Sequence, residues 1–114
     1  MNILVTGGLG FIGSNFINHL FVTKHGYNIH NVDCFSYAAN IDNIDEAVQR
    51  SPRYKLYDCD ISNRSKLEEY IIDNNITHIV NFAAESHVDN SIADSTPFIE
   101  TNINGTHNLL EIVR

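Results

Sequence analysis

The chain has 114 residues, a formal net charge of -7 and 43% hydrophobic residues, which is enough for one small domain with a core. Its acidity argues against a general nucleic-acid binder, and it has neither a run of about eighteen apolar residues that would span a membrane nor a recognisable signal peptide. Two cysteines, Cys34 and Cys59, indicate a reducing compartment and neither a disulfide framework nor a metal site, so we expect a cytoplasmic protein.

The beginning of the chain predicts a strand, a glycine-rich turn and a helix. Residues 2–6 predict the strand, and residues 11–24 predict the helix, which Gly26 is expected to end as a left-handed cap. The helix prediction rests on apolar side chains that recur with a helical period. They are Phe11, Ile12, Phe16, Ile17, Leu20 and Phe21.

Three glycines, Gly7, Gly10 and Gly13, lie three residues apart between this strand and this helix. Glycine tolerates a positive φ in the turn, and without a Cβ it lets the backbone approach a ligand closely. The N–H groups at the start of the helix would then point at an anion, which the helix dipole also favours. The arrangement predicts a site for the pyrophosphate of a dinucleotide; the alternative is a tight turn that binds no ligand.

Asp33 ends a second apolar strand, predicted over residues 29–33. It follows Gly13 by about twenty residues, where a dinucleotide-binding fold has the acid that accepts hydrogen bonds from the adenosine ribose. A carboxylate there repels a 2′-phosphate, and the next residue, Cys34, carries no positive charge to offset the repulsion. The pattern therefore favours NAD over NADP as the cofactor.

The rest of the chain continues to alternate strands and helices, which favours a parallel sheet with right-handed crossovers. The further predicted elements are a short helix at 41–49, a strand at 54–57, a helix at 64–73, a strand at 78–82 and a helix at 97–113 that starts near Pro97. In the helix at 64–73, we expect Ser62 to be the cap and Leu67, Tyr70 and Ile71 to face inward. Three of the five residues of the strand at 78–82 are apolar, namely Ile79, Val80 and Phe82, and we expect both faces of this strand to be buried.

We therefore expect an α/β fold: a Rossmann-type doubly wound parallel sheet with strand order 3-2-1-4. Residues 1–114 would form the N-terminal part of an NAD-binding domain. Because a complete sheet of this kind needs further strands, we expect the chain to belong to a larger protein.

Two more segments lie at the carboxyl ends of predicted strands, where ligands bind in such sheets. Asp60 would accept a hydrogen bond from an adenine amino group while Ile61 covers the ring; the alternative for Asp60 is an acidic helix cap. Phe82, Ala83 and Ala84 would let the backbone run close to the cofactor's ribose and phosphates; the alternative is tight helix packing.

The segment 85–89 holds the densest polar cluster of the sequence, with Ser86 and His87 between two acids. A serine, a histidine and an acid suggest a hydrolase triad. However, the chain lacks Gly-x-Ser-x-Gly, and adjacent residues on one loop rarely face one another. We interpret this loop as one that hydrogen-bonds a sugar or the nicotinamide end of the cofactor.

Four segments, Thr6–Asn15, Val32–Asn40, Ala83–Ile92 and Glu100–Thr106, carry a resemblance that runs the whole length of the chain. In order and spacing the chain resembles the dTDP-glucose 4,6-dehydratases, which are extended short-chain dehydrogenase/reductases that act on nucleotide sugars. The glycine motif is shared by that whole superfamily. The run Ala-Ala-Glu-Ser-His-Val-Asp and the segment Tyr-Ala-x-Asn are more specific to the dehydratases.

The resemblance implies a role in cofactor binding for residues in all four segments and at two further strand ends. Phe11 and Ile12 would bind the pyrophosphate through their amides, and the wall around the adenosine ribose would consist of Asp33, Cys34, Phe35 and Ser36. Adenine would contact Asp60 and Ile61. The rest of the cofactor would be lined by Phe82, Ala83, Ala84 and Ser86, with Ser86 also near the hexose, and Thr101 would touch the cofactor near its nicotinamide side.

The implied reaction takes hydride from C4 of the sugar, removes water across C5 and C6, and returns the hydride to C6, giving a 4-keto-6-deoxy sugar while NAD stays bound. Cys34 stands where the family usually has Lys, and Ala39 where it usually has Gly. UDP-glucose therefore remains an alternative to dTDP-glucose as the substrate. The residues also leave open a 4-epimerase, a decarboxylase and a non-catalytic NAD-binding module.

The superfamily's catalytic Tyr-x-x-x-Lys is absent from these residues, since none of the five tyrosines has a lysine four positions later. The Thr-Asp-Glu acid/base segment is absent as well, so we expect no catalytic residue in this chain. The resemblance also implies that the helix over 97–113 pairs in a homodimer of the full-length protein, with Ile103, His107 and Leu110 outward. We expect a nucleotide sugar as the substrate, and neither nucleic acid nor a membrane as a partner.

Overall fold

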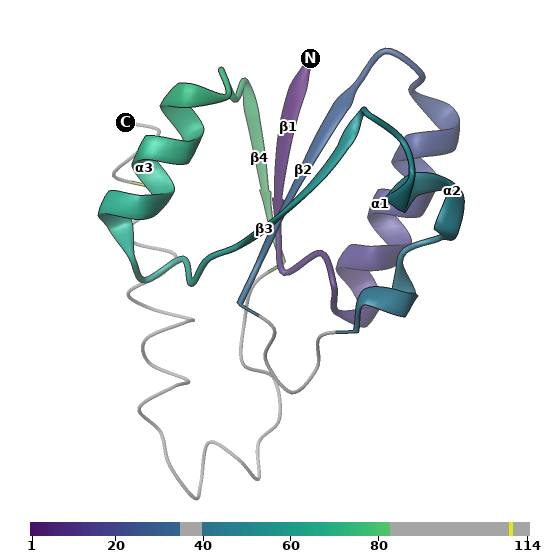
Figure 1. The fold of residues 1–114 in the computed structure, drawn as a ribbon, viewed down its shortest axis with the longest axis horizontal. Helices are drawn as coiled ribbons and strands as arrows, with labels where there is room; N and C mark the ends of the chain where they lie inside the picture. Colours follow the sequence, from purple (N-terminus) through teal and green to yellow (C-terminus); the bar gives the residue numbers. More distant parts are fainter. Residues whose placement is uncertain (35–39, 83–109, 111–114) are drawn as a thin grey trace, which may run out of the picture.

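The structure, a computed structural model, describes residues 1–34, 40–82 and Leu110, and a parallel sheet forms its centre. The strands are β1 (Asn2–Thr6), β2 (Asn28–Asp33), β3 (Tyr54–Asp58) and β4 (His78–Asn81). They lie in the order β3-β2-β1-β4, and every neighbouring pair is parallel (Figure 1). The predicted strand order is therefore confirmed, and each strand begins and ends within one residue of its predicted bounds.

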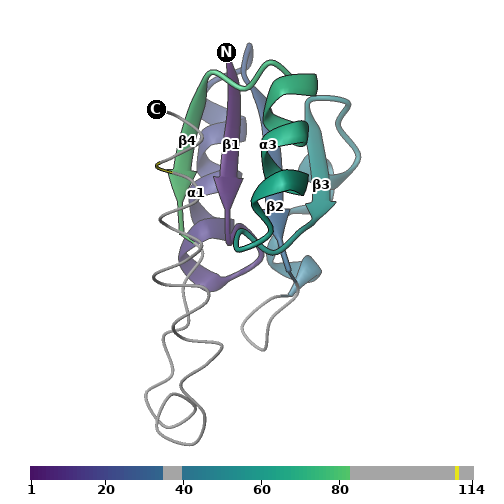
Figure 2. The same cartoon turned by 90° about the vertical axis from the view of Figure 1, so that its left-hand side faces the viewer.

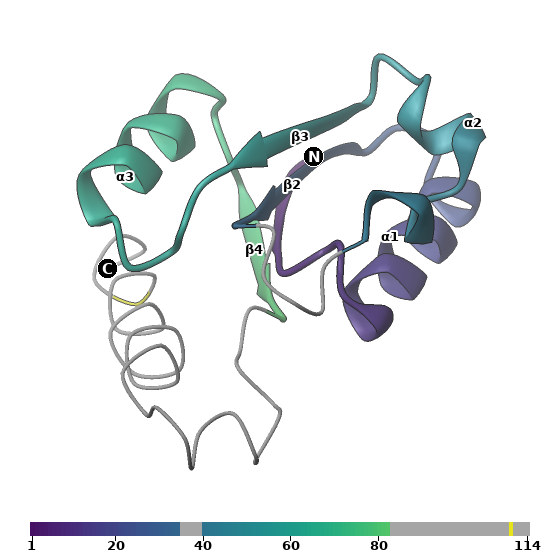
Figure 3. The same ribbon diagram turned by 60° about the horizontal axis from the view of Figure 1, so that its bottom comes forward.

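Helices cover both faces of the sheet (Figures 1 and 3). On one side lie α1 (Phe11–Thr23), the 3₁₀ helix η1 (Ile41–Asn43) and α2 (Glu46–Gln49), and on the other lies α3 (Arg64–Asp73). Figure 2 shows α3 in front of the sheet and α1 behind it. The helix predicted over 41–49 is divided in two because Ile44 has an extended backbone between η1 and α2. The helix predicted over 97–113 lies outside the described residues, except for Leu110, which is exposed.

The sheet separates two apolar clusters of buried side chains. The cluster on the α1 side consists of Ile3, Val5, Leu9, Ile17, Ile29, Ile44 and Val48. The cluster on the α3 side consists of Leu4, Val32, Cys59, Ile61 and Leu67. Because alternate residues of β1 and β2 enter opposite clusters, these two central strands are buried on both faces, as parallel strands covered by helices usually are.

Two apolar residues at the start of α1 do not face the core, although they belong to the apolar pattern that predicted the helix. Phe11 is 78% exposed and Ile12 is 68% exposed. Gly13 and Ile17, four residues apart, are buried against the loop and the sheet, and Phe11 falls on the opposite side of the helix. The close contact of Gly13 with the glycine loop fixes this rotation of the first helical turn, so Phe11 and Ile12 point away from the core.

The left-handed cap predicted at Gly26 is wrong. Among the residues that the structure describes, Gly7 is the only glycine with a positive φ. α1 ends at Thr23, and the N–H of Lys24 closes the last turn by donating to the carbonyl of Leu20 at 2.9 Å.

Arg53 satisfies the carbonyl groups at the end of α1. Its guanidinium donates to the carbonyl oxygens of Phe21, Lys24 and Tyr27 at 3.0–3.2 Å, and it lies 4.2 Å above the centre of the Phe21 ring. A positive charge at this helix end is favoured by the helix dipole. The arginine that precedes β3 therefore takes over the capping role that the sequence assigned to a glycine.

α3 is capped by Asn63 and not by Ser62. The Asn63 side chain accepts a hydrogen bond from the N–H of Lys66 at 3.3 Å. Ser62 instead donates through both its N–H and its hydroxyl to Oδ1 of Asp60, each at 2.9 Å. The prediction was displaced by one residue because the carboxylate of Asp60 takes both donors of the serine. Leu67 is buried, as predicted.

The end of α3 is a Schellman motif centred on Asn75, whose φ is 52°. The N–H of Ile76 donates to the carbonyl of Ile71 at 3.1 Å, and the N–H of Asn75 donates to the carbonyl of Ile72 at 3.3 Å. Both Ile71 and Ile76 pack against the α3-side cluster, which is the apolar contact that accompanies this motif. Asparagine adopts the left-handed conformation at lower cost than most other residues.

β4 is less buried than its apolar sequence predicts. His78 and Asn81 are exposed, while Ile79 and Val80 are half-buried. Within the described part of the chain, β4 pairs with β1 alone, so it forms an edge of the sheet. The prediction that both faces of this strand are buried is therefore wrong for the residues seen here.

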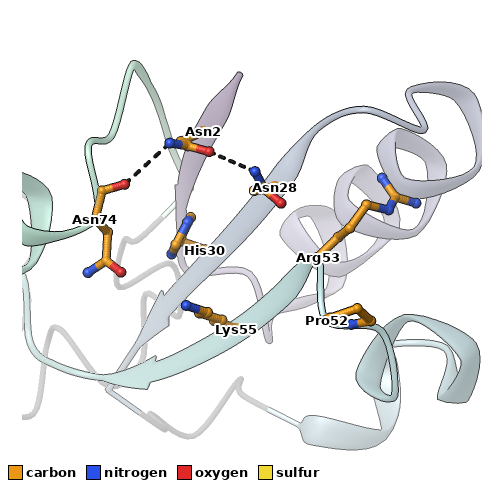
Figure 4. Close-up of a pocket in the computed structure, with 7 residues that line it drawn as sticks. All are labelled: Asn2, Asn28, His30, Pro52, Arg53, Lys55 and Asn74. Atoms are coloured by element: carbon orange, nitrogen blue, oxygen red, sulfur yellow. Dashed lines mark hydrogen bonds between the residues drawn. The ribbon is translucent and has the colours of Figure 1, made fainter.

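A polar pocket lies at the amino ends of the strands, at the edge opposite the glycine loop (Figure 4). Its lining consists of Asn2, Asn28, His30, Pro52, Arg53, Lys55 and Asn74. His30 is 5% exposed, and its Nδ1 lies 2.8 Å from the hydroxyl of Tyr70. Burial lowers the pKa of His30, and the nearby ammonium of Lys55 lowers it further.

Replacing Asn75 by valine should lower the free energy of unfolding by about 1–2 kcal/mol, because a β-branched side chain adopts the left-handed conformation at a higher cost than asparagine does. Asn75→Gly should retain the native free energy or exceed it, since glycine adopts this φ without penalty. Both variants keep the Asn75 carbonyl, which accepts from Nδ2 of Asn2 at 3.1 Å. Urea denaturation measures the difference, and equal stability of the two variants would contradict the role assigned to φ.

The free energy of unfolding should fall as the pH is lowered from about 7.5 to about 5. The pKa of His30 is lowered below 6.5 in the folded protein, so the unfolded chain takes up a proton that the folded chain does not. This stability is present above pH 6.5 and is lost as the pH falls through the folded pKa. Urea denaturation at several pH values should show a flatter profile for His30→Gln and an unchanged profile for the exposed control His25→Gln. A native slope in His30→Gln would contradict the assignment.

Candidate functional site

The glycine loop joins β1 to α1 at the carboxyl edge of the sheet. Gly7 has a φ of 68°, which turns the chain sharply after β1. Its N–H donates to the carbonyl of Val32 at 2.9 Å, and its own carbonyl accepts from the N–H of Gly10 at 3.2 Å. The positive φ predicted for a glycine of this turn is therefore confirmed at Gly7.

Gly13 and Gly8 are glycines because the chain packs too closely for a side chain. A Cβ on Gly13 would lie 2.4 Å from the carbonyl oxygen of Gly7. A Cβ on Gly8 would lie 2.2 Å from Oδ1 of Asn31 and 2.5 Å from Cδ1 of Ile17. The sequence motif predicted Gly13 but missed Gly8, whose constraint comes from a residue of β2.

Gly10 differs from these two glycines. It is the N-cap of α1, with φ -74° and ψ 173°, a conformation that any residue adopts. A Cβ there would meet nothing closer than the carbonyl oxygen of Gly7 at 3.4 Å, which is an ordinary contact. The protein's own packing therefore does not require glycine at position 10, whereas close approach of a ligand to the backbone would.

The first turn of α1 offers N–H groups without an acceptor in the described part of the chain. Ser14 donates to the carbonyl of Gly10 at 2.9 Å, but no described residue accepts from the N–H groups of Phe11, Ile12 or Gly13. No side chain caps this end of the helix. Such a helix start is suited to binding an anion, because its N–H groups and the helix dipole both favour negative charge.

The carboxylate of Asp33 holds the glycine loop against the end of β2. Its Oδ2 accepts from the N–H of Leu9 at 3.1 Å, and Asp33 is 6% exposed. The sequence predicted this acid as the partner of a ribose and did not predict its bond to the loop. The spacing of about twenty residues from Gly13 gave no sign of this contact, since it depends on the pairing of β1 with β2.

The carbonyl group of Leu9, like its N–H group, is hydrogen-bonded to distant residues. It accepts from the N–H of Asn40 and from Nδ2 of Asn43, each at 3.0 Å. The side chain of Leu9 is fully buried in the α1-side cluster. Sequence reasoning missed Leu9 and Asn43; their polar contacts link segments more than thirty residues apart in the chain.

Asp60 and Ile61 lie where β3 leads into α3, but their side chains are occupied by the fold itself. Oδ1 of Asp60 accepts two hydrogen bonds from Ser62. Ile61 is 3% exposed and packs in the α3-side cluster. Apolar packing under α3 thus holds most of the Ile61 side chain in the core, and its contact with an adenine ring stays a prediction.

The end of β4 lies beside the glycine loop. The N–H of Phe82 donates to the carbonyl of Thr6 at 2.9 Å, and the hydroxyl of Thr6 donates to Oδ1 of Asn81. The Phe82 ring lies 5.4 Å from the Phe16 ring of α1, centre to centre. Phe82 is thus brought to the same edge as the loop. The predicted site residues Phe35, Ser36, Ala83, Ala84, Ser86 and Thr101 lie outside the described residues.

The carboxyl edge therefore brings together three features. They are a helix start with available N–H groups, a glycine, Gly10, that the protein's own packing does not require, and the acid that ends β2. Cys34 follows that acid and is exposed. Such an edge fits a dinucleotide, with its phosphates at the helix and its ribose near the acid.

No three His, Cys, Asp or Glu side chains of the described residues gather as a metal site. No helix in the same residues is long and apolar enough to cross a membrane.

A parallel sheet with this strand order and a glycine-rich first turn is a Rossmann-type nucleotide-binding fold. The sequence matches the family GDP-mannose 4,6 dehydratase over residues 4–114. The chain therefore belongs to this family, which agrees with the predicted fold class.

Three known proteins illustrate the similarity. The dTDP-glucose 4,6-dehydratase of Neisseria meningitidis is 43% identical over 112 residues, which cover 98% of this chain and 31% of that protein. The structure of dTDP-glucose 4,6-dehydratase from Bacillus anthracis in complex with NAD matches with a TM-score of 0.86 and 42% identity, over 99% of this chain and 33% of that one. The structure of UDP-glucose 4-epimerase from Thermotoga maritima with UDP-glucose matches with a TM-score of 0.83 and 30% identity, over 98% of this chain and 33% of that one.

The resemblance to the dTDP-glucose 4,6-dehydratases is thus confirmed. The chain spans about a third of the length of the relatives that it matches. The matched third contains the glycine loop and the acid at the end of β2.

Gly13→Ala should lower the free energy of unfolding by about 1–3 kcal/mol, because the new methyl group would lie 2.4 Å from the carbonyl oxygen of Gly7 and 2.9 Å from Cα of Gly8. Gly10→Ala should change it by less than about 1 kcal/mol, since its methyl group meets only the ordinary contact at 3.4 Å. Urea denaturation of the two variants beside the native protein measures both effects. Equal losses would contradict the distinction between the two glycines.

Proposed function

We propose that this chain binds NAD at the carboxyl edge of its sheet. Gly10 is the observation that carries the proposal, because it is a glycine at the helix start that the protein's own packing does not require. The N–H groups of Phe11 and Ile12 would bind the pyrophosphate. The carboxylate of Asp33, which accepts from the N–H of Leu9, would also accept from the adenosine ribose.

The remaining contacts are proposed for the residues that flank this edge. Cys34, Phe35 and Ser36 would complete the wall around the ribose, and Asp60 and the backbone of Ile61 would contact adenine. Phe82, Ala83, Ala84, Ser86 and Thr101 would line the rest of the cofactor, with Ser86 also near the sugar.

We further propose that the whole protein is a dTDP-glucose 4,6-dehydratase, an NAD-dependent lyase that acts in the cytoplasm as a homodimer. The identity of 42–43% with dehydratases, against 30% with a 4-epimerase, supports this reaction. NAD would take up and return the hydride, and this chain would hold and orient it. Because these residues lack Tyr-x-x-x-Lys, proton transfer from the sugar hydroxyl would depend on residues outside them.

Gly10→Ala should weaken NAD binding at least tenfold, about 1.4 kcal/mol, while the protein remains folded. Its methyl group would occupy space that the pyrophosphate needs. Isothermal titration calorimetry with NAD measures the effect. Gly26→Ala is the matched control, since a Cβ at Gly26 meets nothing within 4 Å, and it should bind NAD as the native protein does. Unchanged affinity in folded Gly10→Ala would overturn the site.

The reaction is tested with the whole protein and two substrates. Incubation with dTDP-glucose should give a 4-keto-6-deoxy product that absorbs in the ultraviolet in alkali, and UDP-glucose should react more slowly. A product that is only the 4-epimer would overturn the dehydratase assignment and leave NAD binding intact. Failure to bind NAD in the calorimeter would overturn both.

A further inference from the structure

The two cysteines occupy neighbouring positions at the ends of paired strands. β2 and β3 pair in parallel register with Asp33 opposite Asp58, and the N–H of Cys59 donates to the carbonyl of Asp33 at 3.2 Å. The residue that follows Asp33 is Cys34. This register, continued by one residue, predicts that the two cysteines lie side by side where the ladder ends, although 25 positions separate them in the sequence.

Cys59 lies on the α3 side of the sheet, and the alternation of side chains along β2 predicts the same side for Cys34. Val32 and Cys59 are buried in the α3-side cluster, whereas Asp33 reaches Leu9 of the glycine loop on the α1 side. Because side chains alternate along a strand, the position after Asp33 returns to the side of Val32. Neighbouring strands lie about 4.8 Å apart, which falls within the Cα separation of about 4.4–6.8 Å that a disulfide bridges.

The two thiols differ in their access to solvent. Cys34 is exposed, whereas Cys59 is 3% exposed. Burial raises the pKa of the Cys59 thiol, the Lys66 ammonium opposes that change, and the carboxylates of Asp60 and Asp58 add to it. An oxidant from solution would therefore meet Cys34 first, and Cys59 would react only with a group already formed beside it.

We propose that Cys34 and Cys59 form an intramolecular disulfide when the protein meets a peroxide, and that this disulfide weakens cofactor binding. In the first step the sulfur of Cys34 attacks the peroxide, the O–O bond breaks, and Cys34 becomes a sulfenic acid as one oxygen leaves as water. In the second step the sulfur of Cys59 attacks that of Cys34; the S–S bond forms, and the hydroxyl leaves as water with the thiol proton. Two thiols are oxidised and one hydrogen peroxide is reduced to two waters.

The effect on the cofactor follows from the position of Cys34 next to Asp33, and this part of the inference rests on the proposed function. A disulfide holds the two Cβ atoms about 3.8 Å apart, closer than neighbouring strands usually hold them. Forming the bond would therefore draw the Cβ of Cys34 toward that of Cys59 at the end of the ladder. That movement disturbs Asp33, whose carboxylate binds the N–H of Leu9 in the glycine loop.

The test uses the protein as its gene encodes it, reduced and then treated with hydrogen peroxide. After the remaining thiols are blocked, peptide mapping by mass spectrometry should find the Cys34 and Cys59 peptides joined, about two mass units below their sum. Calorimetry should find NAD affinity at least tenfold lower in the oxidised protein and restored by dithiothreitol. Bound NAD should slow the formation of the disulfide.

Two variants serve as controls. Cys34→Ser replaces an exposed side chain and should bind NAD with an affinity that peroxide does not change. Cys59→Ala should leave a Cys34 sulfenic acid that dimedone traps. Cys59 lies in the core, so Cys59→Ala could fail to fold. In that case the comparison of the native protein with Cys34→Ser still decides the proposal.

Absence of the joined peptides in peroxide-treated native protein would overturn the disulfide, whatever the affinity for NAD. If the peptides are joined but the affinity for NAD is unchanged, the proposal that the disulfide weakens NAD binding is overturned. If the reduced protein does not bind NAD, the proposed function fails, while the joined peptides still decide whether the cysteine pair exists.

Discussion

The hydrogen bond from the N–H of Leu9 to the carboxylate of Asp33 is the contact on which the arrangement of this site depends. It is buried and 3.1 Å long, and a bond to a charged acceptor contributes about 1.5–3 kcal/mol. It fixes the glycine loop to the end of a different strand. The start of α1 is therefore oriented by the sheet and not only by the loop's own turn.

The same loop residue organises the next segment of the chain. The carbonyl of Leu9 accepts from Asn40 and Asn43, and Asn18 of α1 bonds both the carbonyl of Asn43 and the N–H of Asp45. The first βα unit and the short helices after β2 are thus joined through polar contacts around one buried leucine. This network holds in place a loop rich in glycine, which is costly to order.

Much of the fold follows from local patterns in the sequence. Strand positions and order could be predicted because strand and helix patterns alternate along the chain, and the crossover rule leaves few topologies. The errors occur where a distant residue decides a local feature. Arg53 makes a glycine cap of α1 unnecessary, and the contact of Gly13 with Gly7 turns Phe11 away from the core.

The candidate site was predictable to a similar extent. A motif identifies the glycines and the acid at the end of β2, because their spacing along the chain reflects one βαβ unit. It does not reveal that Gly8 is required by Asn31, nor that the side chain of Ile61 is in the core. Both depend on which strand lies beside which, and the sequence records that only indirectly.

The two edges of the sheet differ in how fully their polar groups are paired. At the amino edge, Arg53 and the asparagines Asn2, Asn28 and Asn74 bond carbonyl groups and one another. At the carboxyl edge, the N–H groups of the first helical turn have no acceptor among the described residues, and Phe11 is exposed. Helix ends are usually capped and large apolar side chains usually buried. A fold that departs from both rules at one edge supports the proposal that the ligand binds there.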